Sequence, residues 1–210
     1  MKILVRGTNW IGDSVMSAPA LRKLKQSLPD ARITLASPAW SEGIFRDADF
    51  LDDILVIKAT GHSLGAVRSR AAEYRKGGFD AAILFTNSFV SALTVRAAGI
   101  GRRFGYGAEA RGFLLTKSFP KPEWKNERHE SEYYLLLVEN AVREMGFVPS
   151  EGTPDGTIPV SEARRGRARA LLEANGLGAS EGFAVIGAGS TNSRAKRWPA
   201  DRFAAVADAL

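Results

Sequence analysis

Short apolar runs alternate with longer segments of helical pattern through most of this chain, and that alternation restricts the fold it can adopt. We expect strands at Ile3–Val5, Ile33–Ala36, Ile54–Ile57, Ala81–Phe85 and Arg103–Tyr106, and helices at Asp13–Gln26, Ser41–Phe45, Leu64–Lys76, Phe89–Ala98 and His129–Met145. Strands of this kind, separated by helices, are typical of a parallel sheet buried on both faces. The sequence therefore predicts an α/β fold with a parallel sheet in its N-terminal domain.

Two places interrupt this pattern. Pro19 lies inside the first helical segment and has no amide proton for the helix ladder. Either the helix kinks there, or its regular part begins near Ala18 and leaves Asp13 on a looser turn. The stretch Thr116–Asn126 is rich in Pro and Lys, and we expect a loop.

A turn-rich stretch, Ser150–Thr157, has the composition of an interdomain linker, so we place the domains at residues 1–155 and 156–210. After it we expect a short strand at Ile158–Val160, a basic helix over Glu162–Asn175, a strand at Phe183–Ile186 and a helix over Pro199–Leu210. These few elements cannot cover both faces of a second sheet. Residues 156–210 are therefore expected to be the incomplete start of a second domain.

Composition excludes several functional classes. The chain of 210 residues is 45% hydrophobic and 25% charged, as in ordinary soluble proteins, and it has neither a transmembrane run nor a signal-peptide pattern. It has no cysteine and only two histidines, which excludes disulfides and thiol chemistry and argues against a metal site. We expect a cytoplasmic protein.

The charge is positive and unevenly distributed. The net charge is +6, and between Lys58 and Arg111 nine Lys and Arg residues face only three acids. Such a surface favours phosphorylated small molecules, a membrane surface or nucleic acid as partners. Nucleic acid is disfavoured, because the basic residues are not interleaved with aromatic ones. A solvated basic face without a ligand remains the alternative.

The first motif with chemical content is Gly7–Asp13, which follows the strand Ile3–Val5 and precedes a helix. In open α/β sheets, ligands collect at this end of the strands. The motif matches neither Gly-x-Gly-x-x-Gly nor the P-loop, which argues against a nicotinamide cofactor. Asp13 is either a functional carboxylate in the crevice or a helix N-cap.

The second motif is Gly187–Pro199, a small and polar loop that follows an expected strand and brings Lys196 to the start of a helix. Free amides, hydroxyls and a cation at such a place suit a phosphate or diphosphate group. A flexible surface loop is the alternative.

Taken together, these motifs carry a family resemblance. The motifs are Ile3–Asp13, Pro19, Asn87–Ala92, Arg103–Tyr106, Arg111–Leu115, the pairs Arg128-His129 and Tyr133-Tyr134, and Ala195–Pro199. In this order they closely resemble the bacterial ADP-heptose:lipopolysaccharide heptosyltransferases of glycosyltransferase family 9, the heptosyltransferase II branch above all. The resemblance implies a GT-B arrangement of two Rossmann-like domains, of which this chain holds the first and the incomplete start of the second. Its N-terminal domain receives the lipopolysaccharide inner-core acceptor, and its C-terminal domain holds the ADP-heptose donor. It also implies transfer with inversion and no cofactor.

The resemblance further implies roles for single residues. Asp13 is the expected general base, with Thr8, Asn9 and Trp10 on the acceptor side. Ser190, Thr191 and Lys196 are expected to bind the donor diphosphate, and Arg68, Arg70 and Arg103 to meet acceptor phosphates. Two departures stand out: the loop between Ala188 and Lys196 is long, and the family's later Asp-x-Gly-x-x-His-type turn is missing. We therefore expect donor binding to be crippled in this chain by itself.

Two other functions remain open from sequence. One is a GT-B glycosyltransferase that uses another nucleotide sugar. The other is a non-catalytic module that binds an anion or phosphosugar. For the enzyme we expect a cytoplasmic location peripheral to the inner membrane, with transient contact to its surface and no nucleic-acid partner.

Overall fold

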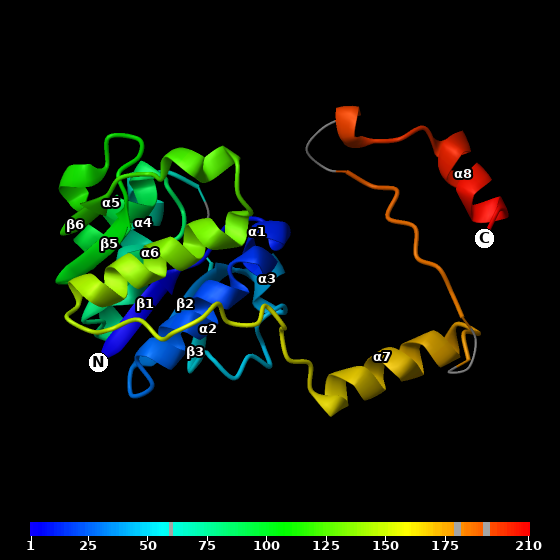
Figure 1. The fold of residues 1–210 in the computed structure, drawn as a ribbon, viewed down its shortest axis with the longest axis horizontal. Helices are drawn as coiled ribbons and strands as arrows, with labels where there is room; N and C mark the ends of the chain where they lie inside the picture. The colour runs from blue at the N-terminus through cyan, green and yellow to red at the C-terminus, as the bar shows by residue number, and fades with distance from the viewer. Residues whose placement is uncertain (59–60, 179–181, 191–193) are drawn as a thin grey trace. The chain divides into compact units, whose positions relative to one another are not determined.

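The computed structural model describes residues 1–58, 61–178, 182–190 and 194–210, which form two compact units, Met1–Val160 and Ser161–Leu210. The first unit is built on one six-stranded sheet (Figure 1). Its strands are β1 (Lys2–Arg6), β2 (Arg32–Pro38), β3 (Asp53–Ile57), β4 (Ala81–Leu84), β5 (Arg102–Tyr106) and β6 (Lys117–Phe119). Its helices are α1 (Ile11–Met16), α2 (Ala18–Ser27), α3 (Ala39–Glu42), α4 (Leu64–Gly77), α5 (Phe89–Ala97) and α6 (Glu130–Glu144), with short 3₁₀ turns at Gly112–Leu114 and Glu123–Asn126.

The strand order is β3-β2-β1-β4-β5-β6, and every neighbouring pair is parallel. This is the order of a Rossmann-like sheet, in which the chain reverses direction across the sheet between β1 and β4. The reversal leaves a crevice at the carboxyl ends of these two strands. The α/β fold predicted from the sequence is confirmed, and the expected loop Thr116–Asn126 turns out to contain the short edge strand β6.

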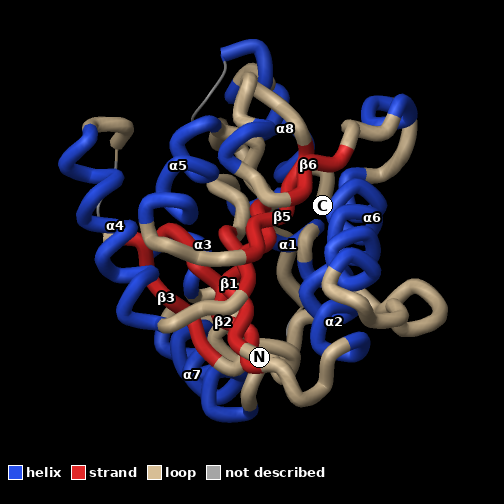
Figure 2. The backbone as a smooth tube through the Cα atoms, turned by 90° about the vertical axis from the view of Figure 1, so that its left-hand side faces the viewer, coloured by secondary structure: helices blue, strands red, loops and turns tan. Residues whose placement is uncertain are grey.

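Each face of the sheet has its own layer of helices (Figure 2). Ile3 and Val5 of β1 point into a core shared with α2 and α6, while Leu4 points to the opposite face and packs with residues of α4 and α5. This alternation follows from the two-residue period of a strand. All three side chains are fully buried, as expected for the central strand of a sheet covered on both faces.

The first helical segment is two helices that meet at Ser17. Helix α2 begins at Ala18 with Pro19 in its first turn, where the missing amide proton costs nothing. The second of the two possibilities left open for Pro19 is therefore correct. Asp13, however, lies not on an irregular turn but in α1, a helix of its own.

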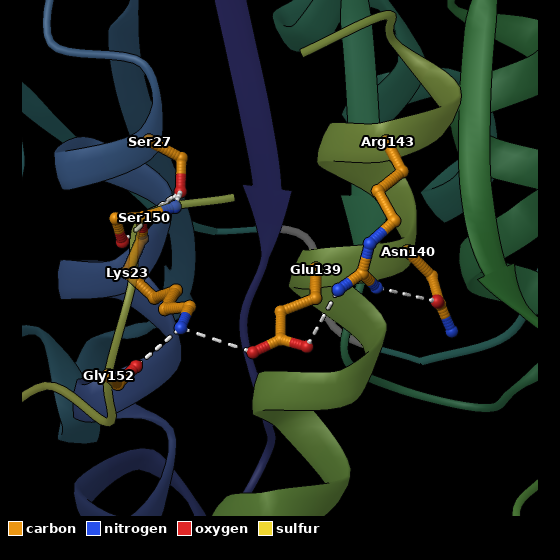
Figure 3. Close-up of polar contacts among 7 residues, drawn as sticks. All are labelled: Lys23, Ser27, Glu139, Asn140, Arg143, Ser150 and Gly152. Carbon is orange, nitrogen blue, oxygen red and sulfur yellow. Dashed lines mark hydrogen bonds and ion pairs between the residues drawn. The ribbon is translucent and has the colours of Figure 1, made fainter. Parts of the chain in front are cut away.

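A buried lysine ties α2 to α6 and to the segment after α6 (Figure 3). The Lys23 ammonium lies 3.2 Å from a Glu139 carboxylate oxygen and donates a hydrogen bond to the Gly152 carbonyl. Glu139 is also paired with Arg143 at 3.4 Å. Only 4% of the Lys23 side chain is exposed. A buried lysine is tolerated only where it is paired in this way.

In the second unit, the described residues form α7 (Glu162–Ala174), a 3₁₀ turn at Arg194–Lys196 and α8 (Ala200–Asp208). Both expected helices of this part are confirmed. The strands expected at Ile158–Val160 and Phe183–Ile186 are not: neither range is in a strand in the described residues. The physical reason is that a strand needs a paired neighbour, and Ile158 instead packs against the core of the first unit.

Candidate functional site

Asp13 lies in a cavity of about 310 Å³ at the carboxyl ends of β1 and β4, the place where the strand order reverses. The loop Gly7–Trp10 and helix α1 form one wall, and the segment Phe85–Ser88 after β4 forms a second. Glu109 also lines the cavity, as do Lys125 of the 3₁₀ turn before α6 and Glu130, Tyr133 and Tyr134 of α6. We call this space the Asp13 cavity.

The turn between β1 and α1, which leads to Asp13, is held by hydrogen bonds to β2 and within the turn itself. The Gly7 amide donates to the Ala36 carbonyl of β2 at 3.0 Å. A Cβ at Gly7 would come within 2.9 Å of Leu35 Cδ1, so only glycine fits without a shift of this neighbour. The Thr8 and Ser14 hydroxyls are bonded to each other at 2.9 Å, and Ser14 also donates to the Trp10 carbonyl. These contacts join both ends of the turn and fix where α1 begins.

Asp13 is not the N-cap of α1. That position belongs to Trp10, and Asp13 lies in the first turn, where a carboxylate is favoured by the free amides and the helix dipole. Within the part of the chain that the structure describes, no hydrogen bond or ion pair engages its carboxylate. The side chain is half-buried. The capping alternative therefore fails, and the carboxylate is available to a ligand in the cavity.

The charges and burial around Asp13 raise its affinity for a proton. Burial raises the pKa of its carboxyl group, the negative Glu130 raises it further, and the positive Lys125 partly opposes both. A higher pKa makes the carboxylate a better proton acceptor. Carboxylates with raised pKa values in crevices are common at functional sites.

Another wall of the Asp13 cavity carries an ion pair, whose lysine lies over an aromatic ring. The Lys125 ammonium is paired with Glu130 and lies 4.5 Å from the centre of the Tyr133 ring. The Tyr133 hydroxyl in turn accepts a hydrogen bond from the Asn87 amide at 3.0 Å. Burial, followed by the charges of Asp13 and Glu130, raises the pKa of Tyr134, so this tyrosine stays protonated.

Arg111 lies fully buried behind this wall and holds it in place. Its Nε donates to the Tyr106 carbonyl, and its Nη1 and Nη2 atoms donate to the segment that follows β4. The acceptors there are the Thr86 and Ser88 carbonyls, the Ser91 hydroxyl and the Asn87 side-chain oxygen. Gly105 leaves room for the guanidinium, because a Cβ there would lie 3.0 Å from Nη2. Arg111 thus sets the position of three residues that line the Asp13 cavity.

The structure brings together four of the residues predicted for this site. Thr8, Asn9, Trp10 and Asp13 all line the Asp13 cavity. Trp10 is exposed, with 58% of its surface accessible, so its ring forms part of the rim. The Asn9 carbonyl accepts a hydrogen bond from the Trp40 indole, which fixes the loop against α3.

The three predicted arginines lie in different places. Arg70 lines a second cavity, of about 290 Å³, on the side of the sheet covered by α4 and α5. Arg68 is exposed on α4 and lines neither cavity. Arg103 donates to the carbonyls of Ile100 and Leu114, so its guanidinium braces the loops around β5. A contact of Arg103 with an acceptor phosphate stays a prediction.

The donor-side residues belong to the second unit. Arg197 Nε donates to the Ser190 carbonyl at 2.9 Å, and Lys196 is exposed at the end of the 3₁₀ turn. Thr191 lies outside the described residues.

Sequence reasoning gave no role to Lys125, Glu130 or Glu109, although all three line the Asp13 cavity. Asn87 carried a detectable signal, because it follows a buried strand at the end where ligands collect. The positive φ angles of Glu109 (49°) and Ala110 (53°), uncommon for residues other than glycine, mark the Glu109 loop only once the backbone is known.

Two other features are absent from the described residues. Among the described residues, no three His, Asp or Glu side chains lie close enough to hold a metal ion. In the same part of the chain, no helix combines the length and apolarity needed to cross a bilayer.

The fold and the site define a Rossmann-like α/β domain whose switch point carries a carboxylate without a hydrogen-bond or ion-pair partner among the described residues. The sequence matches the family described as glycosyltransferase family 9 (heptosyltransferase) over residues 67–210, and the chain belongs to this family. The chain is 28% identical to lipopolysaccharide heptosyltransferase 2 of Escherichia coli K12 and 27% identical to lipooligosaccharide heptosyltransferase 2 of Haemophilus ducreyi. Each alignment covers the whole chain but 60% of the relative, so the chain spans well under two thirds of their length.

Solved structures agree. The structure of E. coli ADP-heptose lps heptosyltransferase II superposes with a TM-score of 0.79 at 27% identity, over the whole chain and 61% of that structure. E. coli heptosyltransferase WaaC with ADP-2-deoxy-2-fluoro heptose gives a TM-score of 0.70 at 17% identity, over the whole chain and 65% of that structure, which supports the fold alone. The family and the GT-B fold class expected from the sequence are confirmed.

Proposed function

We propose that this chain supplies the acceptor side of an inverting heptosyltransferase, in which Asp13 is the general base. The supporting observation is the half-buried Asp13 carboxylate, which faces a cavity at the switch point of the sheet and has no partner in the described part of the chain. The names of the relatives support heptose as the transferred sugar. The donor is then ADP-heptose and the acceptor a heptose of the lipopolysaccharide inner core.

The proposed reaction is a single displacement. The acceptor hydroxyl oxygen attacks the anomeric carbon of the donor, and its proton passes to the Asp13 carboxylate. The bond between the anomeric carbon and the diphosphate oxygen breaks, ADP leaves with the electron pair, and the configuration inverts. One base is enough, so a second carboxylate nucleophile is not needed. Lys196, Ser190 and Thr191 are the proposed donors that stabilise the charge on the leaving diphosphate.

The proposed place of work is the cytoplasmic surface of the inner membrane. The net charge of +6 favours contact with anionic headgroups, at about 1 kcal/mol per basic residue close to the surface. This contact is peripheral and reversible in the proposal.

The test measures ADP release from ADP-heptose with a heptose-bearing core acceptor. It compares this 210-residue chain with a version extended to the length of its relatives. In the extended protein, Asp13→Asn is expected to lower kcat by about 10²–10⁴-fold with acceptor binding preserved. The matched control is Asp30→Asn, which removes an exposed carboxylate far from the sheet's carboxyl edge.

The pH profile adds a second readout. Because the base must be ionised, kcat/KM should fall as pH drops through the pKa of Asp13, which burial and Glu130 hold above the ordinary aspartate value. Full activity in Asp13→Asn would refute the general-base role. Acceptor binding without turnover in either length of chain would instead favour the non-catalytic binding module, and turnover with another nucleotide sugar would favour a different GT-B enzyme.

A further inference from the structure

Lys125 and Glu130 line the Asp13 cavity but take no part in the displacement proposed above. Lys125 belongs to the 3₁₀ turn before α6. Glu130 is the first residue of α6, where the free amides of the helix favour a carboxylate. The two side chains form an ion pair, and both are half-buried. We call them the Lys125–Glu130 pair.

The Asp13 cavity contains more carboxylates than cations. Among the described residues that line it, Lys125 is the only cation, and the carboxylates are those of Asp13, Glu109 and Glu130. The Glu109 carboxylate accepts a hydrogen bond from the Phe89 amide at 3.2 Å. Lys125 is close enough to Asp13 to lower the pKa of its carboxyl group, yet in the described part of the chain it is paired with Glu130. Asp13 is thus left without a cation in a cavity that holds one.

Two contacts fix the position of the Lys125 ammonium. One is the ion pair with Glu130, and the other is the Tyr133 ring, whose centre lies 4.5 Å away. The ring is itself held in place, because it stacks on Tyr106 with 4.2 Å between ring centres and its hydroxyl accepts a hydrogen bond from Asn87. A cation gains from an aromatic face and from a carboxylate. Since the stem of a lysine is long and flexible, these contacts decide where its charge lies.

Loss of the Glu130 charge would release Lys125 to another carboxylate. Glu109 is already engaged by a backbone amide, so Asp13 is the acceptor left for the ammonium among the described lining residues. A cation paired with a carboxylate stabilises its ionised form and therefore makes it a weaker base. The cation also occupies the place from which a hydroxyl group has to approach.

We propose that Glu130 is a positioning residue for Asp13: it binds the Lys125 ammonium and thereby leaves the Asp13 carboxylate free to accept the proton of the acceptor hydroxyl. This inference rests on the proposed function for the role of Asp13 as base. The competition of Asp13 and Glu130 for one ammonium, however, concerns the first unit alone. The Tyr133 ring is the second support of the lysine, and it keeps the ammonium in place without adding a negative charge.

The other titratable groups that face Asp13 leave the effect to the Lys125–Glu130 pair. Burial raises the pKa of Tyr133 and Tyr134 of α6, so both phenols stay neutral. Glu109 comes from a separate loop and is bonded to a backbone amide. Helix α1 also contacts α2 and α3, but no charged residue of these two helices is among the described residues that line the cavity.

The first experiment measures the pKa of Asp13 in the 210-residue chain and needs neither donor nor turnover. The carbon shift of the Asp13 carboxyl group is followed by NMR as pH is varied, and Asp13→Asn assigns the signal. Glu130→Gln is expected to lower this pKa by about one pH unit or more, because Lys125 then pairs with Asp13. Lys125→Met is expected to raise it, because an opposing positive charge is removed.

The double variant separates pairing from direct repulsion between the two carboxylates. In the Lys125→Met background, Glu130→Gln should lower the pKa of Asp13 much less than it does when Lys125 is present. The matched control is Glu132→Gln, which removes the same charge from the same turn of α6. Glu132 is paired with Arg128 and lies outside the cavity, so this variant should leave the pKa of Asp13 unchanged.

An unchanged pKa of Asp13 in Glu130→Gln overturns the proposal. So does a fall of equal size with and without Lys125, since that reflects only the charge of Glu130 itself. Should Glu130→Gln not fold, Lys125→Met still decides, because a pKa of Asp13 that does not rise shows that the lysine does not act on it.

Turnover in the extended protein supplies a second readout. Glu130→Gln should lower kcat about tenfold with little change in KM, a part of the 10²–10⁴-fold that a general base contributes, and the added Lys125→Met should restore most of the loss. Glu132→Gln should stay within about twofold of the unmodified protein. A loss that Lys125→Met does not restore contradicts the positioning role. If Asp13→Asn keeps full activity, the general-base role fails while the titration result stands.

Discussion

Replacing Arg111 with methionine tests how the wall of the Asp13 cavity is built. Arg111 is fully buried and donates five hydrogen bonds to the residues that follow β4 and to the end of β5. Methionine is of similar length but donates none. The variant therefore leaves three carbonyls, those of Thr86, Ser88 and Tyr106, without this donor.

The size of the effect follows from two opposing contributions. Hydrogen bonds from a charged donor contribute about 1.5 kcal/mol each at the lower end of their range, or about 7 kcal/mol for the set. Against this, burial lowers the pKa of Arg111 from 12.5 to about 10, which corresponds to a cost of about 3 kcal/mol for keeping the charged form. The difference predicts that Arg111→Met lowers the free energy of unfolding by about 4 kcal/mol.

Urea-induced unfolding of the 210-residue chain measures this change. The signal is near-UV circular dichroism, because the stacked pair Tyr106–Tyr133 lies beside Arg111, with ring centres 4.2 Å apart. The midpoint should fall with little change in the slope m. The melting temperature of a unit of this size should drop by about 8–16 °C.

Arg143→Met is the matched control. Arg143 is an exposed arginine of α6 whose main contact is an i,i+4 pair with Glu139, so its loss should cost less than about 0.5 kcal/mol. Arg111→Lys should fall between the two, since an ammonium keeps the charge but cannot reach all five acceptors. If Arg111→Met loses no more stability than Arg143→Met, the hydrogen bonds of Arg111 do not hold the wall and the reasoning is wrong.

Two further predictions concern a buried lysine and an exposed aspartate elsewhere in the first unit. Lys23→Met should lower the free energy of unfolding by about 1–3 kcal/mol. This is less than the loss of a partner from a fully buried ion pair costs, because Glu139 keeps Arg143 as a partner. Equal urea midpoints for this variant and the unmodified chain would contradict the prediction. Burial raises the pKa of Asp52, but hydrogen bonds from the Ile33 amide and Lys25 outweigh it and leave the pKa below its ordinary value. The stabilisation from the Asp52 carboxylate is therefore complete above about pH 4 and is lost as pH falls through the folded-state pKa. Asp52→Asn should reduce the difference in free energy of unfolding between pH 7 and pH 3. An unchanged difference would refute the stabilising role of the Asp52 carboxylate.

Much of the fold was predictable because its signals are local. Apolar runs such as Ile3–Val5 and Ala81–Phe85 mark strands buried on both faces, and the helical periods between them mark the crossovers. The predictions failed where pairing decides the structure. Strand β6 is short and mostly exposed, and it forms only because β5 offers a parallel edge. Phe183–Ile186 has a strand-like sequence but no paired neighbour in the described residues.

The site shows the same division between local and long-range information. The sequence by itself determined that Asp13 follows β1 at the end where ligands collect, because this depends on chain order alone. Only the tertiary structure decided that Asp13 is free of the N-cap position, that Glu130 and Lys125 face it, and that Arg6 and Arg70 share a cavity. These residues come from distant parts of the chain, and their side chains meet because the sheet brings the carboxyl ends of its strands to one edge. Charge balance, burial and pKa depend on those meetings, so they are properties of the folded unit.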